Sequence, residues 1–214
     1  MDNQLRCVSH EIRNQISVCE LYTQILKKTL ENKGLHDKNV DNAINCITKS
    51  LKLMSNNLTD LKSLDNLNPK RYDINRLVKA GIDLAIVYIE DKDIEISLTC
   101  EKEFEVYTDE NKFLSCIVNI IKNGIEAIDK KGQINICISD SENDFVSVKI
   151  SNNGEKISNP DKVFEEGFTT KKTGNGLGLA ICKKNMEMLN GELRLNQSDS
   201  DITEFEILLK KFTL

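Results

Sequence analysis

Residues 110–150 read ENKFLSCIVNIIKNGIEAIDKKGQINICISDSENDFVSVKI, and this stretch decides the fold of the larger part of the chain. Its first half, about Glu110–Lys130, has apolar residues at helical spacing and predicts an amphipathic helix. Its second half alternates apolar and polar residues, which predicts strands around Ile136 and Val148. A helix followed at once by two strands indicates helices layered on a sheet.

The flanking sequence adds elements of both kinds. Further helices are expected from Asp73 to Ala85 and at about 176–190, and further strands at 94–100, 193–195 and 205–209. The strands look mostly antiparallel. We therefore expect an α+β chain in which residues 71–214 form an α/β sandwich, with helices on one face of a sheet.

The amino-terminal region has a different pattern. Residues 2–66 contain no proline, and apolar residues recur there at coiled-coil spacing: Val40, Ile44, Ile47, Leu51, Met54, Leu58 and Leu61. A turn signal between Asn32 and Asp37 predicts a helical hairpin. Because a two-helix hairpin cannot bury its apolar stripe alone, we expect residues 1–67 to pair with a second copy as a dimeric four-helix bundle. A linker at Leu67–Lys70 follows.

Composition excludes several classes of protein. The chain has 214 residues and a net charge of -5, with acidic and basic residues interspersed, so we expect no nucleic-acid partner. Its seven cysteines are widely spaced and include no CxxC pair, which is typical of reduced, buried thiols. We find neither a secretory segment nor an apolar run long enough to span a bilayer, and expect a cytoplasmic protein.

The first chemical constellation is Ser9–Asn14, which reads SHEIRN. If Val8 and Ile12 face the bundle seam, His10 points to solvent and can be reached by another domain. A neutral imidazole is a nucleophile toward phosphorus, and the adjacent Glu11 is a candidate base that can hold its tautomer. An outward-facing histidine can equally be without function, and we assign no function to His36 in the turn.

The second and third constellations could bind a polyphosphate. Asn119 and Asn123 project from one helical face, where their amide oxygens can help hold hydrated Mg²⁺. Further along, residues 169–179 read TTKKTGNGLGL and run into a helix. Glycines there let backbone N–H groups approach phosphate at a helix N-terminus. Taken alone, Asn152–Glu155 predicts a simple turn.

Together these motifs resemble the transmitter core of sensor histidine kinases, over nearly the whole chain. The resemblance pairs residues 9–14 with the phosphoacceptor box, 119–127 with the N box, 152–157 with the first glycine box, 163–171 with the F box and nucleotide lid, and 174–179 with the second glycine box. The motifs stand in the family's order. The resemblance implies a dimerisation and phosphotransfer hairpin followed by a Bergerat-type (GHKL) domain that binds ATP and Mg²⁺.

The same resemblance assigns roles to residues. It makes His10 the phosphorylated residue, Glu11 the base, and Asn14 an aid to phosphatase chemistry on a phosphorylated partner. It assigns Mg²⁺ to Asn123, supported by Asn119. The residues expected around the nucleotide are Asn119, Lys122, Asn123, Asn152, Gly154, Thr170, Lys171, Gly174, Gly176, Leu177 and Gly178.

The sequence departs from the family at the first glycine box. Asn152 stands where the family usually has an Asp that accepts the adenine amino proton, and Lys156 replaces a glycine. An amide oxygen accepts this hydrogen bond more weakly than a carboxylate, by about 1 kcal/mol.

Three functions remain open from the sequence. The leading one is an ATP-dependent kinase that phosphorylates His10 and passes the phosphoryl group to an aspartate of a response-regulator receiver domain. The second is a non-enzymatic phosphotransfer adaptor with a degenerate ATP-binding domain. The third, an ATPase that acts as a mechanical clamp, leaves the His10 constellation unexplained.

Overall fold

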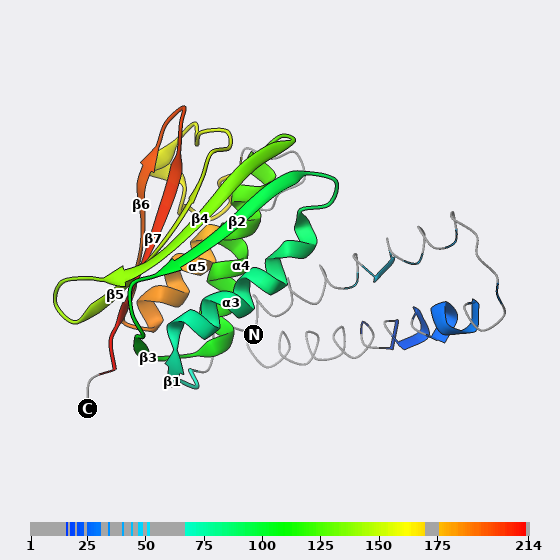
Figure 1. Cartoon of the computed structure of the whole chain (residues 1–214), viewed down its shortest axis with the longest axis horizontal. Helices are drawn as coiled ribbons and strands as arrows, with labels where there is room; N and C mark the ends of the chain where they lie inside the picture. Colours follow the sequence, from blue (N-terminus) through cyan, green and yellow to red (C-terminus); the bar gives the residue numbers. More distant parts are fainter. Residues whose placement is uncertain are drawn as a thin grey trace. The chain divides into compact units, whose positions relative to one another are not determined.

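The computed structural model describes residues 67–169 and 176–212 without a break, together with single residues and short runs between Ile16 and Leu51. The chain divides into two compact units, Met1–Asp65 and Asn66–Leu214. In the second unit, a sheet carries a layer of helices on one face, as the sequence predicts (Figure 1).

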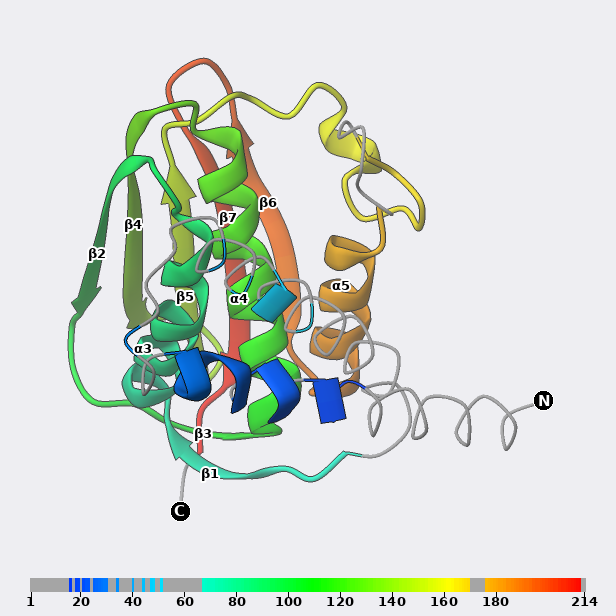
Figure 2. The same ribbon diagram turned by 90° about the vertical axis from the view of Figure 1, so that its right-hand side faces the viewer.

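The elements of the second unit follow each other in the order β1 (Lys70–Asp73), α3 (Ile74–Ala85), η1 (Ile86–Tyr88), β2 (Asp93–Cys100), β3 (Glu105–Thr108), α4 (Glu110–Ala127), β4 (Lys131–Asp140), β5 (Phe145–Asn152), η2 (Pro160–Lys162), α5 (Gly178–Met188), β6 (Glu192–Ser198) and β7 (Thr203–Lys210). The five-stranded sheet has the order β2-β4-β5-β7-β6, and β1 pairs with β3 in a separate two-stranded sheet. Helices α3, α4 and α5 lie side by side against the larger sheet (Figure 2).

The sheet is mostly antiparallel, as expected, with one parallel pair, β2 and β4. The structure corrects two expectations. Lys70, expected in the linker, begins β1, which pairs with the equally unforeseen β3. Helix α4 ends at Ala127 rather than near Lys130, because the backbone is already extended at Ile128. Short strands and parallel pairings have no periodic signature of their own in a sequence.

The core lies between the helices and the sheet. Along β4, Ile134, Ile136 and Ile138 are buried while Gln133 and Asn135 face solvent, which is the alternation predicted from the sequence. A shift of one residue would expose all three isoleucines, so burial fixes the register of this strand. Helix α4 buries its apolar stripe from Phe113 to Ile125 against the same core.

The start of α4 is fixed by Asp109, which is 5% exposed. Its Oδ1 accepts a hydrogen bond from the backbone N–H of Lys112 at 3.1 Å and caps the helix. Its Oδ2 accepts from the N–H of Asn68 at 2.8 Å. One carboxylate therefore joins the segment before β1 to the beginning of α4.

In the first unit, the described residues of 16–30 and 40–51 are helical, and Gly34 between them lies in a turn. Ile16 and Leu51 are buried and pack together, whereas Leu21 and Tyr22 are 56% and 67% exposed. The hairpin as a whole and its dimeric bundle lie largely outside the described residues and remain predictions. Among the described helices, none combines the length and the hydropathy needed to cross a membrane.

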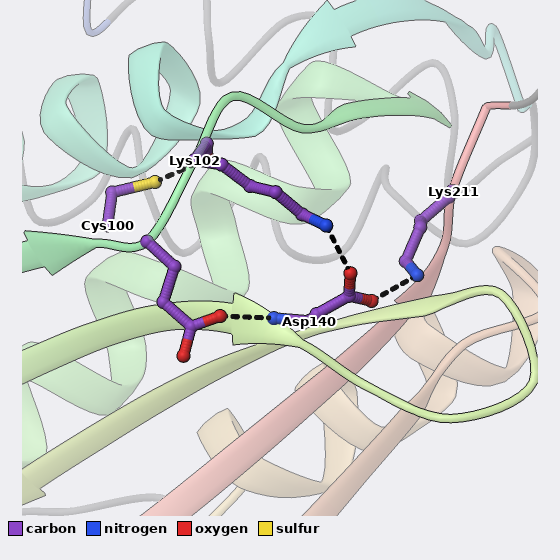
Figure 3. A network of polar contacts seen from close by, with 5 residues as sticks. Cys100, Lys102, Asp140 and Lys211 are labelled. Atoms are coloured by element: carbon purple, nitrogen blue, oxygen red, sulfur yellow. Dashed lines mark hydrogen bonds and ion pairs between the residues drawn. The ribbon is translucent and has the colours of Figure 1, made fainter.

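A cluster of charges joins three parts of the second unit around Asp140, at the end of β4 (Figure 3). Lys102, from the β2–β3 connection, donates to Asp140 Oδ2 at 2.5 Å, and Lys211, just after β7, donates to Oδ1. The N–H of Asp140 donates to Glu101 Oε2 at 3.1 Å. Hydrogen bonds lower the pKa of Asp140 from 3.8 to about 2; the one from Lys102 has the largest effect and the one from Lys211 the second largest.

We expect Asp140→Asn to destabilise the protein at about pH 6, by an amount that shrinks in acid. The carboxylate stabilises the folded state above its unfolded pKa near 3.8, and this contribution is lost as the pH falls through about 2. Denaturant unfolding of both proteins at several pH values measures the difference. Asp161→Asn, on the exposed η2 turn, is the matched control. A difference independent of pH would contradict the assigned ion pairs.

Candidate functional site

Two segments that the sequence singled out contact a third one, helix α4, in the second unit. The three segments are the middle and end of α4, the turn that follows β5, and the start of α5. Contacts between α4 and α5 and between α4 and β5 bring them together, although they are separated by long stretches of sequence.

Helix α4 contributes Asn119 and Asn123, one turn apart and both half-buried. A Cβ built on Gly178, the first residue of α5, would lie 3.1 Å from Asn119 Oδ1. The absence of a side chain at Gly178 thus allows the start of α5 to approach the Asn119 amide. This contact brings the start of α5 against the middle of α4.

Asn152, at the end of β5, is 6% exposed and uses both ends of its amide. Its Oδ1 accepts from the N–H of Gly154 at 3.0 Å, and its Nδ2 donates to the Thr203 carbonyl in a long hydrogen bond of 3.4 Å. These two backbone partners, one donor and one acceptor, fix the orientation of the amide. Asn152 also packs on Gly124 of α4, where an added Cβ would lie 3.3 Å from its Cβ.

The turn after Asn152 lies directly on the end of α4. The N–H of Glu155 donates to the carbonyl of Ala127 at 2.9 Å. A Cβ on Gly154 would lie 2.6 Å from the Ala127 carbonyl carbon and 2.8 Å from Ile128 N, so only glycine fits there. The sequence predicted a turn but not that it is docked on a helix end.

The start of α5 has no side-chain cap. Leu177 is its N-cap residue and makes no side-chain hydrogen bond to the helix. Just before it, Gly176 has a φ of +66° and its carbonyl accepts from the N–H of Gly167 at 3.1 Å. An uncapped helix start preceded by glycine is suited to binding an anion.

The F box is anchored beside this site. Val163 is buried, and the ring of Phe164 packs edge-on against Phe205 of β7, with centroids 6.3 Å apart. Lys183 of α5 lies over the Phe164 ring at 5.3 Å. The segment that leads toward the glycine-rich loop is therefore held between α5 and the sheet.

Lys122, expected to contact the nucleotide, has other partners in the structure. Its ammonium lies 5.0 Å from the centre of the Tyr88 ring and 3.9 Å from Glu126 Oε1. Both contacts draw the side chain along α4 toward η1. Its expected role at the nucleotide remains a prediction.

The remaining predicted site residues, His10, Glu11, Asn14, Thr170, Lys171 and Gly174, lie outside the described residues. Conversely, the structure adds contacts that the sequence did not predict. Thr203 and Gly124 position Asn152, and Ser198 accepts from the N–H of Ile157 at 2.8 Å. A glycine inside a helix such as α4 is itself a sign of close packing.

The site is thus rich in neutral donors and acceptors. Amide oxygens on α4 suit Mg²⁺, and the backbone N–H groups in the first turn of a helix such as α5 suit phosphate oxygens. Such a set can hold a metal–polyphosphate without a dedicated cluster of acidic metal ligands. Within the described residues, no group of three or more His, Cys, Asp or Glu side chains could hold a metal ion.

Residues 108–213 match the family model of the histidine kinase-, DNA gyrase B- and HSP90-like ATPases. Among curated proteins, sporulation kinase C of Bacillus subtilis is 28% identical over 94% of this chain and 47% of its own length. The signal transduction histidine-protein kinase AtoS of Escherichia coli is 26% identical over 88% of this chain and 31% of its own. The chain spans less than half the length of either relative.

Solved structures show the same likeness. The catalytic domain of histidine kinase ThkA is 27% identical and superposes with a TM-score of 0.61, covering 67% of this chain and 96% of that one. Full-length ShkA in complex with AMPPNP, at 19% identity, shares the fold over 99% of this chain and 46% of its own, with a TM-score of 0.75. The comparisons therefore identify a histidine kinase-type ATP-binding core in this chain, in which residues 108–213 match the histidine kinase-, DNA gyrase B- and HSP90-like ATPase family model.

Proposed function

We propose that this protein is an ATP-dependent histidine kinase that phosphorylates its own His10 and transfers the phosphoryl group to an aspartate of a response regulator. The observation that carries the proposal is the junction at Asn119, where the N box meets the start of α5. It places amide oxygens suited to Mg²⁺ beside N–H groups suited to phosphate.

In the proposed reaction, the second unit binds Mg·ATP and presents the γ-phosphoryl group. Asn123, supported by Asn119, holds the hydrated Mg²⁺, which neutralises the phosphate charge. The N–H groups near Gly176 and Gly178 contact the phosphates, with Thr170, Lys171 and Gly174 in the same loop. Catalysis is mostly positioning and charge neutralisation, as is general for phosphoryl transfer.

The nucleophile is the imidazole of His10, with Glu11 as the base. Its nitrogen forms the new bond to phosphorus while the bond to the β–γ bridging oxygen breaks and ADP leaves. A receiver aspartate then attacks the phosphohistidine. Asn14 assists the phosphatase reaction, in which the phosphorylated partner is hydrolysed, by orienting the attacking water.

The assembly is part of the proposal. We propose that residues 1–67 pair as a homodimeric four-helix bundle and that residues 71–214 form the catalytic domain. The exposed Leu21 and Tyr22 in the first unit support an apolar contact with a second copy. A cytoplasmic location and a receiver domain as partner belong to the same proposal.

The alternative is a phosphotransfer adaptor whose second unit binds no nucleotide. One observation favours it: Asn152 and Lys156 depart from the first glycine box. The geometry of Asn152 weighs against it. The turn is well formed, and a second lone pair on Oδ1 can accept a hydrogen bond from the amino group of adenine.

Transfer of label from γ-labelled ATP tests the kinase directly. We expect wild type with Mg²⁺ to gain acid-labile, base-stable label, and His10→Gln to gain none, because the nucleophile is gone. His36→Gln, which changes the chain's only other histidine, should label like wild type. Label that persists in His10→Gln would refute the assignment. Labelling from a phosphorylated receiver without ATP binding would favour the adaptor.

A second variant tests the metal site. Asn123→Ala should weaken Mg²⁺-dependent ATP binding at least tenfold, because it removes an oxygen that supports the hydrated metal. Asn111→Ala, exposed in the first turn of the same helix, is the control and should bind like wild type. Calorimetric titration with and without Mg²⁺ separates the metal contribution. Equal affinity of Asn123→Ala and wild type would remove Asn123 from the site.

A further inference from the structure

The end of α4 has a side-chain cap from a distant part of the chain. The ammonium of Lys92, in the connection between η1 and β2, donates to the carbonyls of Ile125 at 2.8 Å and Ile128 at 2.6 Å. The last carbonyls of a helix have no partner within it, and a cation there also interacts favourably with the helix dipole. Lys92 is half-buried, so its stem lies against the protein.

The same helix end carries the turn after β5. The carbonyl of Ala127 lies between the two that Lys92 caps and accepts from the N–H of Glu155 at 2.9 Å. Gly154 approaches the Ala127–Ile128 peptide so closely that a Cβ would lie within 2.8 Å of it. The cap and the turn therefore contact the same four-residue stretch of backbone, residues 125–128.

Without the ammonium, two partly buried carbonyls would lose their charged donor. Helix ends without caps fray, and their last turn changes direction to reach other donors. A change of direction at Ala127 would pull the Glu155 hydrogen bond apart and shift Gly154. Because Asn152 packs on Gly124 one turn earlier, its orientation depends on the same helix end.

Lys131, on the same surface, has a different partner. Lys131 forms an ion pair with Asp93 at 3.0 Å, and its side chain is 82% exposed. Lys92 and Lys131 line one shallow hollow at the edge of the molecule, with Glu90, Asp91, Asp93, Asp129 and Lys130. Removing either lysine changes the local charge equally, but only Lys92 reaches the helix carbonyls described here.

We propose that Lys92 is a positioning residue for nucleotide binding: it caps α4 and thereby holds the Asn152–Glu155 turn in its binding geometry. The proposal rests on the nucleotide site proposed above and adds to it a residue that need not touch the nucleotide. Its effect is on affinity, because the turn it supports belongs to the binding surface.

The test uses the full chain with Lys92→Met, which keeps the apolar stem and removes the ammonium. We expect the Kd for Mg·ATP, measured by calorimetry where circular dichroism shows each protein fully folded, to rise at least fivefold. Lys131→Met should stay within twofold of wild type. Lys92→Arg, which can still donate to both carbonyls, should recover most of the affinity.

Amide hydrogen exchange supplies a readout that a loss of global stability would not reproduce. We expect the Glu155 and Ile128 amides to lose protection in Lys92→Met, while amides in the middle of β5 keep theirs. Weakened binding together with this local loss supports the proposal. An unchanged Kd in Lys92→Met overturns the positioning role, and so does a uniform loss of protection. A wild-type protein that binds no nucleotide would overturn the proposed function itself, which the wild-type titration reveals separately.

Discussion

The backbone of the turn after β5 lies directly on the backbone at the end of α4, and the rest of the site depends on this contact. Glycine at 154 permits the approach, and the Glu155–Ala127 hydrogen bond holds it. Glycine at 124 allows the Asn152 side chain to pack on the same helix. Since Gly154 meets the backbone of Ala127 and Ile128, a side chain added there would displace a whole element, whereas one added at Gly124 would press on the Asn152 side chain.

Helix α4 is held at both ends by charged side chains. Asp109 caps its start and also binds the N–H of Asn68, while Lys92 caps its end. Between these caps an apolar stripe packs into the core, and this packing fixes the position of the helix on the sheet. Asn119 and Asn123 lie on α4, so the position of this helix determines where they stand relative to the β5 turn and the start of α5.

The sequence predicted the helices and strands whose apolar residues recur at regular spacing. The α4 helix, the alternation of Ile134, Ile136 and Ile138, and the helix layer on the sheet are all confirmed. The parallel pairing of β2, the short strands β1 and β3 and the Lys92 cap could not be predicted, because each depends on contacts between distant segments. The hairpin with His10 remains a prediction.

Asn152 illustrates how local structure accommodates a departure from a family pattern. Its two backbone partners are of opposite kinds, an N–H at Gly154 and a carbonyl at Thr203. An amide satisfies both, whereas a carboxylate in the same orientation would face the carbonyl with an oxygen and repel it. Asparagine therefore fits this turn better than aspartate would. The weaker acceptor offered to a base is the consequence of that fit, and it does not imply that the site has lost its function.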